Sequence, residues 1–200
     1  MTAKVARQPQ ILIKGTTAAT AAKSAQKAAD VIRVFSARDN VACVFAHEDA
    51  DAVEPNHEQI ADRIERTLVA AGVPCGVHAV VPAWELEAWW FLFPAEVSAV
   101  HAAWIRPSTT GRPGAIPNAK EALKQSLRPP GLSAADRKRF PEYRESDSIT
   151  IAASIKKSGQ IRMVKGHSPS FDRFVRSVDA CCADATAPER RPSRPRAGRR

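Results

Sequence analysis

Long hydrophobic runs are absent from this chain of 200 residues. The strongest apolar run, AWWFLFPAEV (residues 88–97), is interrupted by Pro94 and Glu96, so it falls short of the roughly 18 residues that a membrane-spanning helix needs. The first ten residues, MTAKVARQPQ, have no apolar core of the kind found in signal peptides. We therefore expect a cytoplasmic protein with no membrane partner.

Cysteine is also scarce. The chain has four cysteines, and none of them stands in the C-x-x-C spacing that is typical of zinc sites. This excludes the common structural zinc motifs. Because disulfides are rare in the cytoplasm, we expect all four thiols to be reduced.

Negative charge is outnumbered, since 30 Lys and Arg stand against 21 Asp and Glu, a net charge of +9. Residues 189–200 contribute +5 of this, with six Arg and one Glu. A tail of this composition cannot bury apolar area, so we expect it to be disordered. Two interpretations stay open: a solubilising tail, or a segment that binds nucleic acid through phosphate contacts made by Arg190, Arg191, Arg194, Arg196, Arg199 and Arg200.

The order of strand-like and helical patterns along the chain predicts the fold class. Branched apolar runs at Gln10–Lys14, Val41–Ala46 and Val77–Val81 predict strands. Helical patterns separate them, the clearer one at His57–Ala71, and this alternation is typical of parallel βαβ units. The second half reads as helices: Glu85–Phe93 and Ala95–Trp104 around Pro94, SITIAASIKKS ending at Gly159, and SPSFDRFVRSVDACC starting at Ser168 or Ser170. We expect an α/β fold with a small parallel sheet, flanking helices and a helical C-terminal half. The expected boundaries are a flexible N-terminus at 1–9, one domain at 10–182 and the basic tail at 183–200.

The stretch VFAHEDADA ends an apolar strand in three carboxylates, Glu48, Asp49 and Asp51. In an extended loop, Asp49 and Asp51 point the same way and can share one hard cation, Mg²⁺ or Mn²⁺. His47 beside them is a candidate ligand or proton carrier, or simply the last residue of the strand. The alternative for the whole stretch is a solvated loop whose charges favour the start of the next helix.

A second acidic stretch, PAWELEAWW, follows the strand at residues 77–81. On a helix Glu87 shares a face with Trp90 and Phe91, and a carboxylate on an apolar face needs a partner. We expect Glu87 rather than Glu85 to be functional, unless Glu87 simply pairs with an arginine. Because ligands collect at the carboxyl ends of parallel strands, both acidic stretches should lie in one crevice.

Three motifs in this order give the chain a family resemblance: VACVFAHEDAD, VVPAWELEAWW, and Tyr143 followed by SITIAASI and SPSFDRFV. Together they resemble the TOPRIM-like proteins of bacterial defence islands that are related to RloB. The resemblance implies a compact α/β domain that binds Mg²⁺ and acts on phosphodiester bonds. It places the metal on Asp49 and Asp51, and it implies a glutamate at the end of an earlier strand as general acid/base.

The chain departs from that pattern at Lys14–Gly15, where the family has Glu–Gly. Either Lys14 occupies the glutamate position, or Gln10–Lys14 is the second strand and the first is missing. Glu48 and Glu87 are then the candidate catalytic carboxylates. Two hypotheses follow. The first is Mg²⁺- or Mn²⁺-dependent, nuclease-type chemistry on nucleic acid in bacterial defence, with an ATPase as a candidate partner protein. The second is a non-catalytic nucleic-acid-binding or partner subunit.

Overall fold

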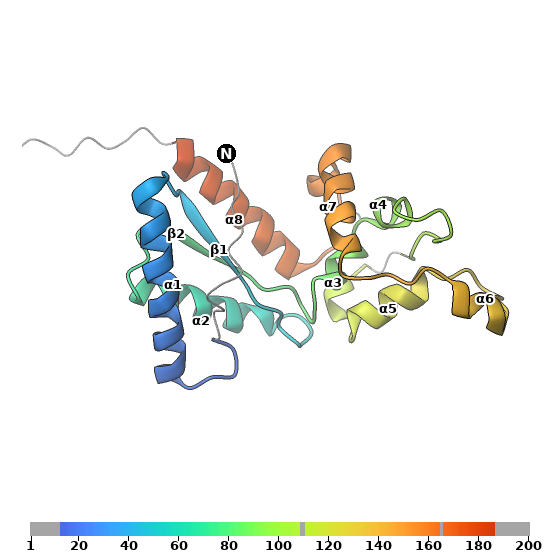
Figure 1. Ribbon diagram of the computed structural model, residues 1–200, viewed down its shortest axis with the longest axis horizontal. Coiled ribbons are helices and arrows are strands. Elements are labelled where there is room, and N and C mark those ends of the chain that lie inside the picture. Colours follow the sequence, from blue (N-terminus) through green and yellow to red (C-terminus); the bar gives the residue numbers. More distant parts are fainter. Residues whose placement is uncertain (1–12, 109–110, 165, 187–200) are drawn as a thin grey trace, which may run out of the picture.

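The computed structural model describes residues 13–108, 111–164 and 166–186 (Figure 1). An α/β half lies at one end of the elongated molecule and a helical half at the other. The elements follow in the order α1 (Ala18–Arg38), β1 (Cys43–His47), α2 (His57–Ala70), β2 (Gly76–Val80), α3 (Glu87–Trp90), α4 (Pro94–Ser98), η1 (Pro113–Ala115), α5 (Ala119–Ser126), α6 (Ala134–Arg139), α7 (Asp147–Ser158), η2 (Gln160–Arg162) and α8 (Pro169–Thr186).

The sheet consists of β1 and β2, paired in parallel from Cys43 opposite Gly76 to His47 opposite Val80. The helix α2 connects them, so the predicted βαβ unit at residues 41–81 is confirmed. Its helix buries Ala61, Ile64 and Leu68, which recur at helical spacing. The α/β class and the small parallel sheet are therefore confirmed, with two strands in the described part of the chain.

The strand predicted at Gln10–Lys14 is not seen in its described portion. Residues 10–12 lie outside the described residues, while Ile13 and Lys14 belong to no strand. Ile13 is nevertheless fully buried in the core of the α/β half. The chain then enters α1, where the Thr17 hydroxyl accepts a hydrogen bond from Thr20 N as the N-terminal cap.

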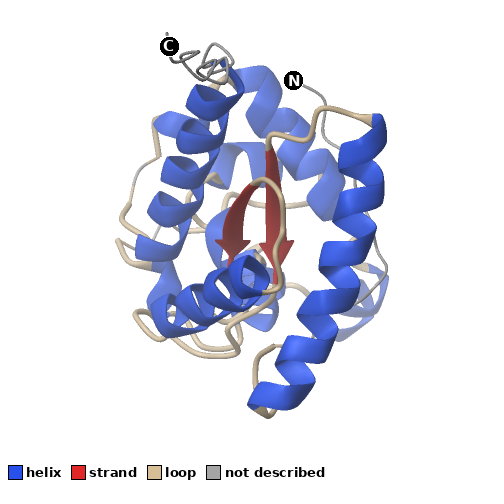
Figure 2. Cartoon of the chain, turned by 90° about the vertical axis from the view of Figure 1, so that its left-hand side faces the viewer, coloured by secondary structure: helices blue, strands red, loops and turns tan. Residues whose placement is uncertain are grey.

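Small side chains allow α1 to pack closely on the βαβ unit. Its buried positions are Ala21, Ala25, Ala28, Ala29 and Ile32, which form one stripe along the helix. These residues share a core with the buried face of α2 and with Ala46 and Ala79 of the strands. Figure 2 shows the helices arranged around the two strands.

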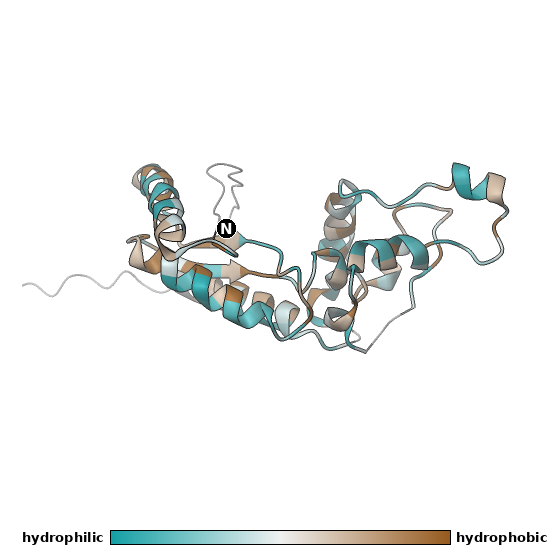
Figure 3. Cartoon of the chain, turned by 90° about the horizontal axis from the view of Figure 1, so that it is seen from below, coloured by the Kyte–Doolittle hydropathy of each residue, from teal (hydrophilic) through white to brown (hydrophobic). Residues whose placement is uncertain are grey.

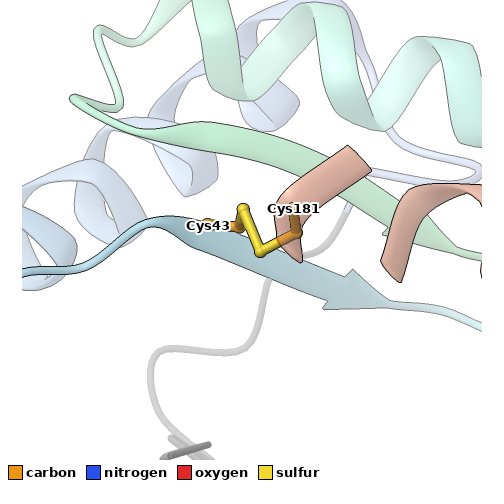
Figure 4. Close-up of a disulfide and its surroundings, with 2 residues drawn as sticks. All are labelled: Cys43 and Cys181. Carbon is orange, nitrogen blue, oxygen red and sulfur yellow. A yellow bond between two sulfur atoms is a disulfide. The ribbon is translucent and has the colours of Figure 1, made fainter. Parts of the chain in front are cut away.

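The C-terminal helix α8 packs against the sheet, and a disulfide fastens it there. Cys43 at the start of β1 is bonded to Cys181, with the two Cα atoms 5.9 Å apart (Figure 4). The expectation of four reduced thiols is therefore wrong; Cys75 and Cys182 take no part in this disulfide. The spacing of the cysteines does not predict this disulfide, because the two partners are 138 residues apart and meet only through the packing of α8 on β1.

The helical half has its own hydrophobic core, rich in aromatic residues. It includes Trp89, Trp90, Phe93, Trp104, Tyr143 and Phe171. The predicted helices at 85–93 and 95–104 are much shorter, at Glu87–Trp90 and Pro94–Ser98, since Pro94 ends one turn and starts the next. The predicted end of α7 at Gly159 is confirmed, with Gly159 at a φ of 69°. No helix among the described residues is long and apolar enough to cross a membrane.

Candidate functional site at the strand ends

The two acidic stretches lie side by side beyond the ends of β1 and β2. Backbone hydrogen bonds continue the pairing of the strands, from Glu48 N to Val80 O at 3.2 Å and from Ala50 N to Pro82 O at 3.1 Å. The ladder closes with Trp84 N donating to Ala52 O at 2.7 Å. Parallel pairing thus brings the residues after each strand to the same edge, as the alternation of strands and helices predicts.

Both segments turn sharply at the same level. Asp51 has a φ of 49° and Trp84 a φ of 57°, and Asp51 N donates to Trp84 O at 3.1 Å. This left-handed conformation is tolerated by aspartate but is unfavourable for a bulky residue such as tryptophan. The turn at Trp84 directs the following residues, Glu85 and Glu87, into the helical half and away from the acidic loop.

Lys14 provides the positive charge of the acidic loop. Its Nζ donates hydrogen bonds to the Asp51 carboxylate and to the backbone carbonyl of Asp49. Its backbone N–H donates to Glu48 Oε1 at 3.0 Å. Lys14 therefore contacts all three acidic residues of the loop.

Glu48 points inward. Its Oε2 atom is buried and accepts no hydrogen bond from the described residues. Burial raises the pKa of Glu48, and the hydrogen bond from the Lys14 backbone and the Lys14 charge oppose that rise. Through its hydrogen bond with Lys14, the partly desolvated carboxyl group of Glu48 holds the loop against the residues before α1.

Asp49 and Asp51 have different partners. Asp49 Oδ1 lies 3.4 Å from Nε2 of His47, an ion pair when that imidazole is protonated, and it accepts no hydrogen bond from the described residues. Asp51 faces Lys14 instead. Among residues 13–108, 111–164 and 166–186, no three His, Cys, Asp or Glu side chains are placed to hold a metal ion. With an ammonium group against Asp51, this arrangement does not fit a divalent cation held by protein groups.

Glu87 belongs to a buried hydrogen-bond network in the helical half. The Tyr143 hydroxyl donates to Glu87 Oε1 at 3.0 Å, and it lies 2.6 Å from Ser148 Oγ. The indole N–H of Trp90 lies within reach of both hydroxyls, at 3.3 and 3.2 Å. Only 6% of Glu87 is exposed, and burial raises its pKa. Its partner is a tyrosine, not the arginine considered from the sequence.

Glu85 is committed to a different contact. Its Oε2 accepts a hydrogen bond from Lys120 N at 3.2 Å, in the first turn of α5. A carboxylate is favoured there because the first N–H groups of a helix lack internal partners. The two glutamates of the PAWELEAWW stretch therefore stabilise the helical half.

Glu54 is half-buried and makes a connection that no sequence pattern predicted. Its Oε1 accepts hydrogen bonds from Ser168 Oγ at 2.7 Å, Ser170 N at 2.9 Å and Ser170 Oγ at 2.8 Å. The indole N–H of Trp89 also donates to Ser170 Oγ, at 2.9 Å. Glu54 thus caps the start of α8, and the Trp89–Ser170 hydrogen bond joins two of the quoted motifs, VVPAWELEAWW and SPSFDRFV, at this cap. No local pattern predicts a helix cap whose carboxylate comes from a segment more than a hundred residues away.

Comparison of the chain with protein-family models, curated proteins and solved structures returns no match. The resemblance to TOPRIM-like proteins therefore rests on the three motifs alone. The six arginines proposed from the tail, at positions 190–200, lie outside the described residues.

Charge is divided unevenly between the two halves. Residues 13–84 and 166–186, which form the α/β half, carry nine Lys and Arg against twelve Asp and Glu, a net charge of −3. Residues 106–144 of the helical half carry nine against three, a net charge of +6. Mean composition hides this concentration of positive charge in residues 106–144, which favours the approach of anionic partners.

Proposed function

We propose that this protein binds nucleic acid through its helical half and acts as a binding or partner subunit. The observation that carries the proposal is the net charge of +6 on residues 106–144. Polyphosphate backbones are attracted to such a surface without any requirement for sequence. The resemblance to TOPRIM-like defence proteins supports the same partner class, and an ATPase remains the candidate protein partner.

The contacts of Lys14 support a non-catalytic role for the acidic loop. A lysine ammonium already neutralises Asp51 and contacts the Asp49 carbonyl. The loop therefore needs no divalent ion to offset its charge repulsion. Its contacts with the chain just before α1 give it a structural role at the edge of the sheet.

The test is binding of fluorescent single-stranded and duplex oligonucleotides to the full chain, with and without EDTA. We expect affinity that is unchanged by EDTA and falls steeply between 50 and 200 mM salt. A variant lacking residues 189–200 separates the tail from the body, and we expect it to retain salt-dependent binding. Absence of binding at low salt would contradict the proposal.

A second candidate is Mg²⁺- or Mn²⁺-dependent phosphodiester chemistry at Asp49 and Asp51, with Glu48 or Glu87 assisting. One observation favours it: Asp49 Oδ1 and Glu48 Oε2 are buried and accept no hydrogen bond from the described residues, so these two loop oxygens have capacity for a cation. Such a site requires the ammonium of Lys14 to move away from Asp51.

Isothermal titration of Mg²⁺ and Mn²⁺ distinguishes the two candidates. The variants are Asp49→Asn/Asp51→Asn, which removes the carboxylates, and Lys14→Ala, which removes the competing cation. Sub-millimolar binding by the wild type that the double variant loses would establish the second candidate. Binding by Lys14→Ala alone would mean that the lysine blocks a latent site, as the binding-subunit proposal expects.

A further inference from the structure

A basic arm projects from the helical half, and we infer that it is the element that grips the phosphate backbone of nucleic acid. The arm comprises residues 128–142 and carries α6 at its tip. Figures 1 and 3 show α6 at the end of the molecule farthest from the sheet. This inference rests on the proposed nucleic-acid-binding function and assigns it to a surface.

The helix α6 has no role in either hydrophobic core. None of its six residues is buried, and every residue from Ser133 to Arg139 is exposed. Its last turn is Arg137, Lys138 and Arg139, three consecutive cations. The nearest acid in the helix, Asp136, accepts a hydrogen bond from the Ser133 hydroxyl at 2.6 Å, in the N-terminal cap. A helix that buries nothing and ends in three cations has no evident structural purpose.

The cations of α6 are not neutralised within the described part of the chain. Three of the other basic residues at 106–144 are paired: Lys120 with Glu145, Lys124 with Glu121, and Arg128 with Glu142. The three of α6 have no carboxylate within ion-pair distance among the described residues, and neither do exposed Arg106 and Arg144. Exposed Arg112, before η1, likewise has no carboxylate within ion-pair distance among the described residues, so the arm carries three of the six unpaired cations at 106–144.

The base of the arm is held rigidly, which makes the arm suitable for binding. Trp104 Nε1 donates to Pro141 O at 2.6 Å, and Ile105 N donates to Leu127 O at 3.0 Å. The Arg128–Glu142 ion pair joins the two ends of the arm, one segment leading to α6 and the other leading away from it. These contacts also place Arg106 next to the point where the arm leaves the core. A positive tip on an anchored base can meet a phosphate backbone at little cost in conformational entropy.

The chemistry of the tip favours contact with phosphates. Residues 133–139 contain no aromatic side chain for stacking on a base, and no Asn or Gln for pairing with a base edge. Arginine and lysine at this spacing bind phosphate oxygens. Phosphate contacts of this kind require no particular sequence, and the number of phosphates that the arm contacts sets the salt dependence.

The test compares two triple variants of the full chain with the same change in charge. Arg137→Ala/Lys138→Ala/Arg139→Ala removes the tip cations. Lys23→Ala/Lys27→Ala/Arg38→Ala removes three exposed cations from α1 and is the matched control. We expect the first to weaken oligonucleotide binding about tenfold or more at 100 mM salt, and to reduce the slope of log K against log [salt] by roughly 2 to 3. We expect the control to leave both nearly unchanged.

The outcomes separate cleanly. If the two triple variants lost oligonucleotide affinity equally, or if neither lost any, the inference about the arm would be overturned while the proposed function stayed intact. A wild-type chain that binds no oligonucleotide would overturn both. Loss of binding to phosphatidylserine vesicles with unchanged oligonucleotide binding would assign the arm to membranes and overturn the inference. Arg137→Lys/Arg139→Lys, which keeps the charge, should retain wild-type binding and exclude a folding artefact.

Discussion

At the scale of single residues, Lys14 and Glu87 show how carboxylates are accommodated in this fold. The acidic loop keeps its charges because an ammonium group reaches two of its residues. Glu87 is accommodated differently, by burial beside a tyrosine hydroxyl. Both solutions leave the carboxylates with internal partners, and each has a measurable consequence.

The first residue-scale prediction concerns Glu87. Burial raises its pKa above the ordinary 4.5, so the folded state holds the proton more tightly than the unfolded state. The associated stabilisation is present below pH 4.5 and is lost as pH rises through the raised pKa. Glu87→Gln keeps an oxygen for Tyr143 and removes the titration. We expect it to be more stable than wild type at pH 7, with the difference shrinking towards pH 4 in urea unfolding.

Glu87→Ala is the matched comparison, since it removes the acceptor as well as the charge. We expect it to lower the free energy of unfolding by about 1 to 3 kcal/mol, because the Tyr143 hydroxyl loses one of its buried partners. If the Gln and Ala variants had equal stability, the Tyr143–Glu87 hydrogen bond would contribute nothing.

His57 gives a pH dependence of the opposite sign. Only 1% of it is exposed, and neither ring nitrogen has a hydrogen-bond partner among the described residues. Burial lowers its pKa, with Arg173 of α8 acting in the same direction and the Glu54 and Glu58 charges opposing it. Because the unfolded state binds the proton more readily, stability is lost as pH falls below about 6.5. We expect His57→Leu to lose less stability than wild type between pH 7 and pH 5. Parallel curves for the two proteins would contradict this.

At the scale of elements, the βαβ unit illustrates what sequence patterns can predict. Val44, Val77 and the stripe of Ile64 and Leu68 are local signals, since each depends on residues within a few turns of the chain. The start of α8 at the SPSF motif was equally readable. The patterns did not predict hydrogen bonds between residues far apart in the sequence. These join Glu54 to Ser168 and Ser170, and Lys14 to Asp51.

The shortened helices have the same explanation. The predicted helix from Glu85 to Phe93 is reduced to one turn because Trp84 adopts a left-handed conformation at the strand end and Pro94 interrupts the continuation. That conformation depends on backbone pairing with Ala52, a contact across 32 residues. The candidate site was thus predictable in its position at the strand ends, but not in its internal contacts.

The prediction at this scale concerns the contact between η1 and the loop before α2. A Cβ atom added at Gly114 would collide with the Glu54 carboxylate, which caps α8. Gly114→Ala should therefore displace Glu54 and cost about 1 to 3 kcal/mol in thermal or urea unfolding. Gly111→Ala is the control, because an added Cβ there meets nothing within 4 Å. Similar stability of the two variants would mean that Glu54 moves without penalty.

At the scale of the whole molecule, the Cys43–Cys181 bond joins the first strand to the last helix. By the chain-entropy relation, closing a loop of 138 residues stabilises the folded state by about 5 kcal/mol. A disulfide of this kind persists in oxidising compartments, which does not accord with the cytoplasmic location expected from the sequence.

The molecular-scale prediction follows from that loop. We expect Cys43→Ala/Cys181→Ala to unfold at a markedly lower guanidinium concentration than wild type. A reductant should move the wild-type midpoint towards that of the double variant and leave the variant unaffected. Cys182→Ser, at an exposed cysteine outside the disulfide, is the control and should behave as wild type. A wild-type midpoint that does not respond to reductant would contradict the prediction.

The same bond changes what a protease cut does to the protein. Cys43 and Cys181 enclose most of the chain, including the basic arm and every loop of the helical half. A single cut anywhere between them opens a covalent ring and leaves one molecule of unchanged mass apart from a water. On a gel without reductant the cut protein would run as one band, and with reductant it would separate into two fragments. Backbone cleavage in the arm therefore need not release α8 from the sheet that it covers.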